Sequence, residues 1–201
     1  RGTLTVRFMK SRIFSLLFAF AFALCAIAAD SGRQYYELRV YTTKSEKQQK
    51  QVSDYWQNAG VPAYNRMGIK PIGVFTELED SPTNKIYVLI PFDSLNQFAD
   101  VASKLAVDAT YQKASEEFMS VPKSDPAYVR FDSSLLLAME GMKHLEAPPS
   151  SADKKPWIFE LRTYTCNEGK LETLKTRFRD HTIRIFQRHG MESIGYWIPQ
   201  D

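Results

Sequence analysis

The sequence contains one short motif twice, and this repeat limits the folds that the chain can adopt. Glu-Leu-Arg-x-Tyr-Thr occurs in QYYELRVYTT, which begins at Gln34, and again in WIFELRTYTC, which begins at Trp157. Both copies alternate in polarity, as a strand with one face packed on a core does. Glu37 and Glu160 hold the same place in the two copies. A repeat of this kind predicts two copies of one folding unit.

The first copy predicts a complete unit with the element order β-α-β-β-α-β. The run KIYVLIPF is the most apolar of its strands, so we expect it inside the sheet. The strands are expected at 35–42, 71–78, 85–91 and 128–138, and the helices at 45–67, 95–106 and 108–119. This order is that of a ferredoxin-like unit, an α+β fold, in which we expect the sheet order 4-1-3-2.

The second copy predicts the same opening elements. They are a strand over 157–164, a helix over most of Gly169–His189 and a strand near 193–198. The helix is predicted from residues at spacings of three and four, which share one helical face. That face consists of Leu171, Leu174, Phe178, His181 and Ile185. The given sequence ends at Asp201, so we interpret the second unit as incomplete.

An incomplete second unit needs support from the first. We expect strands 157–164 and 193–198 to run in the same direction with a vacant place between them, because the strand that would pair with both is missing. Two parallel strands and one helix bury too little apolar surface to offset chain entropy alone. The second unit should therefore pack on the sheet of the first, through the face that carries Glu160, Arg162 and Tyr164.

Composition divides the chain into four regions. Residues 9–28 read MKSRIFSLLFAFAFALCAIA, with basic residues, then a short apolar run, then small residues before a cleavage point. This pattern predicts a signal peptide and a secreted or periplasmic protein without a stable membrane span after cleavage; the alternative is a membrane anchor. The other regions are a first domain over 34–142, a Pro/Ser/Lys linker over 147–156 and a truncated second domain over 157–201.

Charge and cysteine content exclude several classes of function. The formal net charge is +3, but residues 1–28 carry four basic side chains and no acidic one. The rest of the chain is close to balance, which argues against nucleic acid or an anionic membrane as partner. Cys166 is the only cysteine after residue 28, so the exported chain has no internal disulfide.

The chain resembles the NIPSNAP family of the dimeric α+β barrel superfamily. The resemblance is carried by YELRVYT, NRMGIKPIGVF, DPAYVRFDSSLL and, above all, FELRTYTCNEGKLETLKTRFRDHTIRIFQRHGMESIGYW. It covers nearly all of residues 34–201. It implies ferredoxin-like units in tandem, with sheets packed face to face into a barrel, and it implies little about chemistry.

Two matching polar stripes are the main candidates for a ligand site. They are Glu37, Arg39 and Tyr41 in the first copy and Glu160, Arg162 and Tyr164 in the second. Alternation suggests that Leu38 and Leu161 lie under the helices and that both stripes face the interior of a barrel. One interpretation is a polar cavity for a small anionic or phenolic molecule, with arginine as the anion partner. The other is that the opposite charges satisfy one another and set the register between packed sheets.

His181 is a further candidate for ligand binding. His189 follows eight residues later, a rotation of about 80° on a helix, so the two imidazoles do not converge on a metal. The other interpretation of His181 is a sheet-facing histidine bonded within the protein. The four arginines between 177 and 188 suggest a solvated helix face. No phosphate loop, zinc pattern or nucleophile elbow occurs, so we expect neither a cofactor nor a metal.

Two functions therefore compete. The first is an exported, non-catalytic module that binds a small molecule or a protein, with a homodimer as a further option. The second is a cofactor-free monooxygenase or isomerase of the dimeric α+β barrel type, an interpretation that rests on analogy of fold. A closed apolar pocket with one or two convergent polar groups would favour the enzyme. A barrel filled by the Glu/Arg/Tyr stripes would favour the module.

Overall fold

The computed structural model describes residues 32–78, 84–145, 147 and 157–200. The expected signal peptide, residues 9–28, lies outside the described residues, as does nearly all of the expected linker. Among the helices that are described, none has the length and apolar character needed to cross a membrane.

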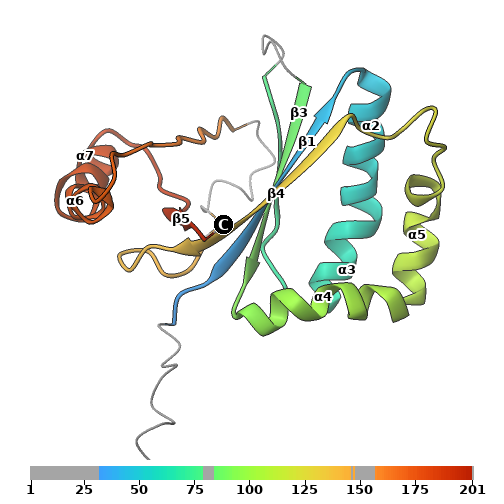
Figure 1. The fold of residues 1–201 in the computed structure, drawn as a ribbon, viewed down its shortest axis with the longest axis horizontal. Helices are drawn as coiled ribbons and strands as arrows, with labels where there is room; N and C mark the ends of the chain where they lie inside the picture. The colour runs from blue at the N-terminus through green and yellow to red at the C-terminus, as the bar shows by residue number, and fades with distance from the viewer. Residues whose placement is uncertain (1–31, 79–83, 146, 148–156, 201) are drawn as a thin grey trace, which may run out of the picture. The chain divides into compact units, whose positions relative to one another are not determined.

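One antiparallel sheet organises the fold, in the order β2-β3-β1-β4-β5 (Figure 1). Its strands are β1 (Tyr35–Thr43), β2 (Gly73–Thr76), β3 (Asn84–Phe92), β4 (Arg130–Ala138) and β5 (Trp197–Pro199). The first four strands have the order expected for a ferredoxin-like unit, so that prediction is confirmed. The apolar strand β3 lies inside the sheet as expected, and β1 pairs with both β3 and β4.

The helices of the first unit cover one face of this sheet (Figure 1). They are α2 (Glu46–Tyr55), the π-helical turn η1 (Trp56–Gly60), α3 (Val61–Arg66), α4 (Leu95–Val107) and α5 (Ala109–Met119). Side chains that accept a backbone N–H begin α2, α4 and α5, because the first N–H groups of a helix lack partners within it. These caps are Ser45, Ser94 and Asp108.

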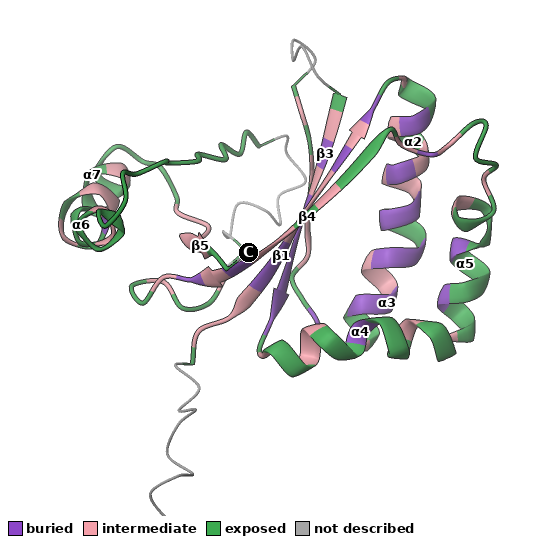
Figure 2. Ribbon diagram, viewed as in Figure 1, coloured by how far each residue is buried: buried purple, intermediate pink, exposed green. Residues whose placement is uncertain are grey.

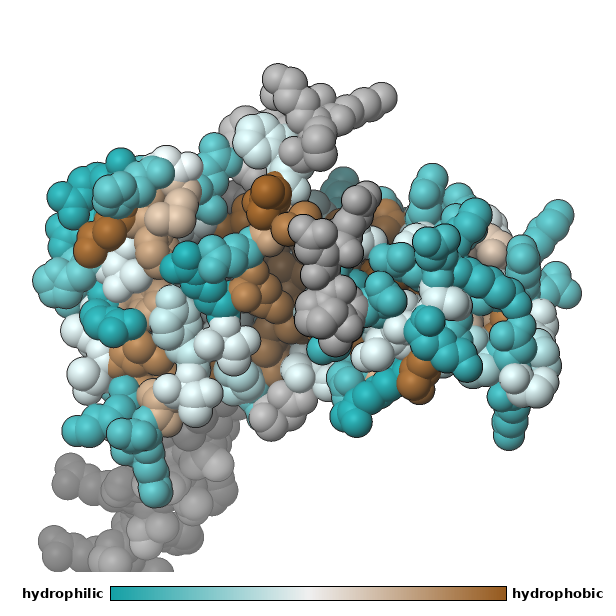
Figure 3. Space-filling view, turned by 90° about the horizontal axis from the view of Figure 1, so that it is seen from above, coloured by the Kyte–Doolittle hydropathy of each residue, from teal (hydrophilic) through white to brown (hydrophobic). Residues whose placement is uncertain are grey.

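The main core lies between the helices and the sheet (Figure 2). Trp56 and Tyr64 are fully buried there, against Ile86, Val88 and Ile90 of β3. A smaller cluster on the opposite face joins Tyr36, Leu89 and Leu136. In Figure 3 apolar residues gather in the middle of the face seen from above, with polar residues on both sides. Both faces of the sheet are therefore apolar in part.

The predicted assignment of side chains to the two sheet faces is wrong. Arg39 lies opposite Val88 and packs with the helices, whereas Leu38 lies opposite Leu89 on the other face. Leu161 is exposed rather than buried. Alternation separates two sets of residues but does not say which set a helix covers. Here the ion pair of Glu37 and Arg39 lies on the helix side, among Tyr41 and the aromatic residues beneath the helices.

The second copy forms its helix but not its first strand. The helix consists of α6 (Leu171–Arg177), η3 (Phe178–Thr182) and α7 (Ile183–Arg188), which confirms the prediction. The expected strand over 157–164 is absent, because the segment has no neighbouring strand to pair with among the described residues. β5 pairs with β4 of the first unit, so the expected parallel pair with a vacant place between its strands is wrong as well.

Contacts between the two copies come from residues other than those expected. Phe159 packs on Phe75 with 5.0 Å between ring centroids, and Trp197 packs on Tyr36 at 5.6 Å. Glu160 and Arg162 are exposed, so the prediction that their face packs on the first sheet is wrong. The second copy still packs on the first, through the pairing of β5 with β4 and these two aromatic contacts.

Both copies interrupt their helix with a π turn at the matching place. The turns η1 and η3 each begin with a buried aromatic residue, Trp56 or Phe178, ten residues before Arg66 or Arg188. Pro62 follows the turn in the first copy, but Arg184 holds its place in the second, so proline is not what makes the turn. In the first copy Gly60 is required by close approach, since a Cβ there would lie 2.6 Å from Trp56 Cε3.

Hydrogen exchange should separate the two copies. In dilute, monomeric protein we expect the amides of 157–165 to exchange far faster than those of β1, because β1 is hydrogen-bonded on both edges and 157–165 has no strand partner among the described residues. Mass spectrometry of peptides after timed deuteration measures both segments in one sample. Equal protection would mean that 157–165 is paired in solution and that the description of the second copy is wrong.

Candidate functional site

A buried ion pair occupies the middle of β1. Glu37 is 5% exposed, and the Nη2 of Arg39 donates to its Oε2 at 2.9 Å. Arg39 Nε lies 2.7 Å from Glu37 Oε1, although its N–H does not point at that oxygen. Ser133 on β4 donates its hydroxyl to Glu37 Oε1 at 2.7 Å. The carboxylate is therefore held by a cation and a hydroxyl from the same sheet.

Aromatic rings enclose the guanidinium of Arg39. Its carbon lies 5.5 Å from the ring centroid of Trp56 and 5.8 Å from those of Tyr64 and Phe131. Nη2 also donates to the hydroxyl of Tyr64 at 2.9 Å. Burial is the largest single influence and lowers the pKa of Arg39, but the hydrogen bond with Glu37 and the charge interactions with Tyr64, Glu37 and Tyr41 together raise that pKa above its usual value. Burial also raises the pKa of Tyr64 to about 12.

These contacts favour the structural interpretation of the first stripe. The charges of Glu37 and Arg39 are used by each other, and Tyr41 packs edge-on against Tyr128 at 5.3 Å. Burial raises the pKa of the Tyr41 hydroxyl, so it stays protonated at neutral pH. The stripe faces the helices and not a barrel interior, which corrects the prediction of where it points. Its contacts tie helix α3 to the centre of the sheet.

The second stripe has the same local pairing in an exposed setting. Arg162 Nε donates to Glu160 Oε1 at 2.7 Å, with the side chains 40% and 62% exposed. The guanidinium of Arg162 lies 5.0 Å from the ring centroid of Phe186, and Tyr164 packs edge-on against Phe178. The stripe thus faces its own helix, as in the first copy. Glu37 and Glu160 belong to separate sites.

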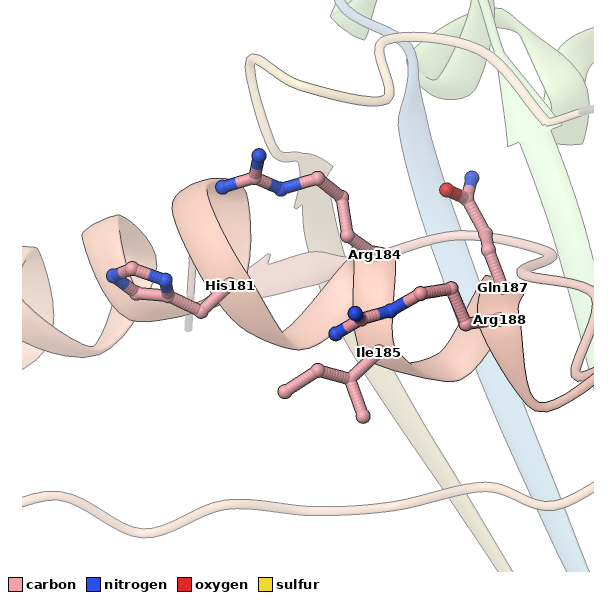
Figure 4. A pocket seen from close by; sticks show the side chains of 5 residues that line it. All are labelled: His181, Arg184, Ile185, Gln187 and Arg188. Atoms are coloured by element: carbon pink, nitrogen blue, oxygen red, sulfur yellow. The ribbon is translucent and has the colours of Figure 1, made fainter.

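A basic cavity lies along the helix of the second copy. Its volume is about 500 Å³, and Figure 4 shows the lining side chains projecting from one helix. They are His181, Arg184, Ile185, Gln187 and Arg188. All of them except Gln187 recur at spacings of three or four residues, which places these four along one face of the helix. The cavity contains cationic and amide donors beside one aliphatic side chain, and no acidic residue lines it.

One acidic residue lies next to the cavity, and it is hydrogen-bonded to an arginine outside the lining. Asp180 is the adjacent acid, and Arg179 donates to it at 2.7 Å and holds the pKa of its carboxyl below the usual value. Arg184 donates to the backbone carbonyl of Asp180, which carries no net charge. Arg188 forms no ion pair with any residue that the structure describes. An anion entering the cavity would therefore meet Arg188, which has no ion pair among the described residues, and Arg184, which interacts with Asp180 together with Arg179.

The structure revises the predicted role of this helix. His181 is exposed and not sheet-facing, because the strands that would cover the helix in a whole unit are not among the described elements. Arg184 and Arg188 were expected to form a solvated face, and sequence analysis missed Gln187. The signal that could have found this group is the spacing from His181 to Arg184 and Arg188. No three potential metal ligands cluster within the described ranges.

The NIPSNAP family profile matches residues 36–125 and again 159–201. This chain belongs to the NIPSNAP family. The two matched segments contain the two copies of the motif, so one profile covers both. No curated protein matches the chain.

Several solved structures are similar to this NIPSNAP chain at low sequence identity and low TM-score. An uncharacterized NIPSNAP domain protein from Burkholderia xenovorans is 17% identical over 50% of this chain and 90% of its own, with a TM-score of 0.39. A Bacillus cereus protein whose name proposes an antibiotic biosynthesis monooxygenase is 15% identical over 58% and 98%, with a TM-score of 0.41. A dimeric ferredoxin-like protein from Bacteroides fragilis is 9% identical over 51% and 93%, with a TM-score of 0.36.

The repeated motif provides its own control for the buried ion pair. We expect Arg39→Ala to lower the free energy of unfolding by about 3 kcal/mol, because it leaves the buried carboxylate of Glu37 without its cation. Arg162→Ala removes the same side chain from the exposed copy and should change stability little. Urea unfolding followed by tryptophan fluorescence measures both. Similar losses in the two variants would contradict a structural role specific to Arg39.

Proposed function

We propose that this NIPSNAP protein is an exported, non-catalytic module that binds a small anionic ligand. The observation that carries the proposal is the basic cavity along η3 and α7, where His181, Arg184 and Arg188 lie without an acidic partner in the lining. Guanidinium groups recognise carboxylates and phosphates by charge-assisted hydrogen bonds. The amide of Gln187 adds a donor and an acceptor, and Ile185 offers an apolar contact.

The alternative enzyme needs a different kind of site. A cofactor-free monooxygenase or isomerase of this fold would hold its substrate in an enclosed apolar pocket with a few polar groups directed inward. The cavity on the second helix is basic, and its lining residues are exposed. The charged groups within the core, Glu37 and Arg39, already bind each other. These contacts support a binding role over chemistry.

Export is the second part of the proposal, and it is supported by the sequence alone. Residues 9–28 combine a basic start, an apolar run and small residues before Ala29. Cleavage near Ala28 would also remove the basic surplus of the amino-terminal region. Intact-mass measurement of the protein from the periplasm or medium should place its first residue near position 29. An intact amino-terminal region on a membrane-bound protein would support the anchor instead.

Titration with small anions tests the cavity. We expect inorganic phosphate and citrate to shift the amide signals of 181–188 in heteronuclear NMR spectra at low salt, and the shifts to weaken at high salt because the charges are exposed. Arg188→Ala should lower the affinity about tenfold or more, since a charge-assisted hydrogen bond is lost.

A variant on the same helix gives the matched control. Arg177→Ala removes an equal charge, but Arg177 lies over the ring of Phe178 and does not line the cavity. Its affinity should stay close to that of the unchanged protein. Equal losses of anion affinity in Arg177→Ala and Arg188→Ala would mean that the affinity depends only on the net charge of the protein. An absence of shifts at 181–188 would contradict the proposed anion site.

A further inference from the structure

Residues 140–145 form a short strap, which turns back toward the sheet after β4 ends (Figure 1). The N–H of Met142 donates to the carbonyl of Met139 at 3.0 Å and closes the turn. The side chain of Leu145 then packs on the apolar cluster of the sheet face opposite the helices. The buried members of that cluster are Tyr36, Leu89, Leu136 and Ala138. The strap therefore covers part of an apolar surface that the helices leave uncovered.

Gln34, just before β1, holds the far end of the strap with its backbone and its side chain. Its N–H donates to the carbonyl of Lys143 at 2.9 Å, and its Oε1 accepts the N–H of Leu145 at 3.0 Å. The same oxygen accepts the hydroxyl of Tyr36 at 2.7 Å, so both of its lone pairs are used. Nε2 donates to Asp93 Oδ1 at 2.9 Å. One side chain thus joins β1, the strap and the residues that follow β3.

This set of contacts requires an amide at position 34. A carboxylate there would still accept from Tyr36 and Leu145, but it could not donate to Asp93. Two carboxylates would then lie within hydrogen-bond distance of each other and repel. The backbone N–H of Asp93 donates to Gln97 Oε1 at 2.7 Å, which ties the aspartate to α4. The chemistry of the Gln34 amide, and not only its size, therefore decides whether the strap is held.

The strap has the features of a segment that opens locally. It contains no residue of a strand or a helix, and most of its residues are exposed, whereas Leu145 is half-buried. Segments that bury little apolar surface open at a low cost in free energy, without unfolding of the rest of the protein. Beneath Leu145, by contrast, Tyr36 is only 1% exposed and belongs to a strand that is paired on both edges. The strap can thus leave a surface that itself stays folded.

We propose that the strap is a lid on this apolar cluster and that Gln34 is the latch that keeps it closed. Opening breaks the two hydrogen bonds from the strap to Gln34 and withdraws Leu145, which uncovers Tyr36 and its apolar neighbours. The strap leads along the chain toward the second copy, which begins at Trp157, so opening also lengthens the connection between the copies. The strap does not line the basic cavity, so anion binding and strap opening can be tested separately.

Tryptic cleavage after Lys143 in the folded, full-length chain measures the open strap, because a protease needs a locally opened segment. Gln34→Ala should speed this cleavage about tenfold or more, since the side-chain hydrogen bond to the strap is lost. It should also increase the fluorescence of the dye ANS, which binds exposed apolar surface. Gln97→Ala is the matched control, because it removes the same type of side chain from the same aspartate without touching the strap. Urea unfolding shows whether each variant is folded.

An exchange of amide and carboxylate separates a latch from general support of the fold. Gln34→Glu should open the strap at neutral pH, because it places two carboxylates against each other. Addition of Asp93→Asn restores a donor opposite an acceptor, so the double variant should be cleaved and should bind dye as the unchanged chain does. Fast cleavage of the double variant would overturn the latch, as would unchanged cleavage of Gln34→Ala. Fast cleavage of Gln34→Ala without added dye binding would overturn the lid.

Discussion

The hydrogen bonds that β1 makes along both of its edges are the constraint on which the rest of this structure depends. They fix the positions of β3 and β4, and they place Glu37, Arg39 and Tyr41 on the helix side of the sheet. Only with that placement can Trp56 and Tyr64 close over the guanidinium of Arg39. The ion pair is thus a result of strand pairing, and Arg39 then holds α3 in place through its hydrogen bond with Tyr64.

The second copy shows what the same motif does without those hydrogen bonds. Glu160 and Arg162 still find each other, because residues two apart on an extended chain share a side. Their environment differs, however, since none of the described strands flanks them and both side chains are exposed. A pair that is structural in one copy is therefore exposed in the other. This difference shows that burial, more than the motif itself, decides what these residues do.

Much of the fold could be predicted from the sequence, because periodicity and turn residues are local signals. The strands around Leu38 and Val88 and the helix through Phe178 follow from spacing alone. The face that Arg39 occupies could not be read in this way, since both faces of the sheet carry apolar residues. Nor could the pairing of β5 with β4, which depends on contacts such as Trp197 on Tyr36.

The candidate site was harder to predict than the fold. His181 could be named from the sequence, but its exposure depends on which strands cover the helix. Arg184 and Arg188 suggested only a solvated surface, because a spacing does not reveal whether an acid lies nearby. The sequence does not show that the carboxylate of Asp180, the acid next to the cavity, forms an ion pair with Arg179.

The π turns have a consequence for how these helices can change. Each residue of an α-helix advances the side-chain direction by roughly 100°. A π turn holds one residue more than an α turn, so it acts as a phase shift between α2 and α3. Loss of that residue would rotate α3 against the sheet and carry Tyr64 away from Arg39. The helix formed by α2, η1 and α3 should therefore tolerate a change of side chain better than the insertion or deletion of a residue. The sequences of α2 and α3 can vary as long as the rotation between them is kept.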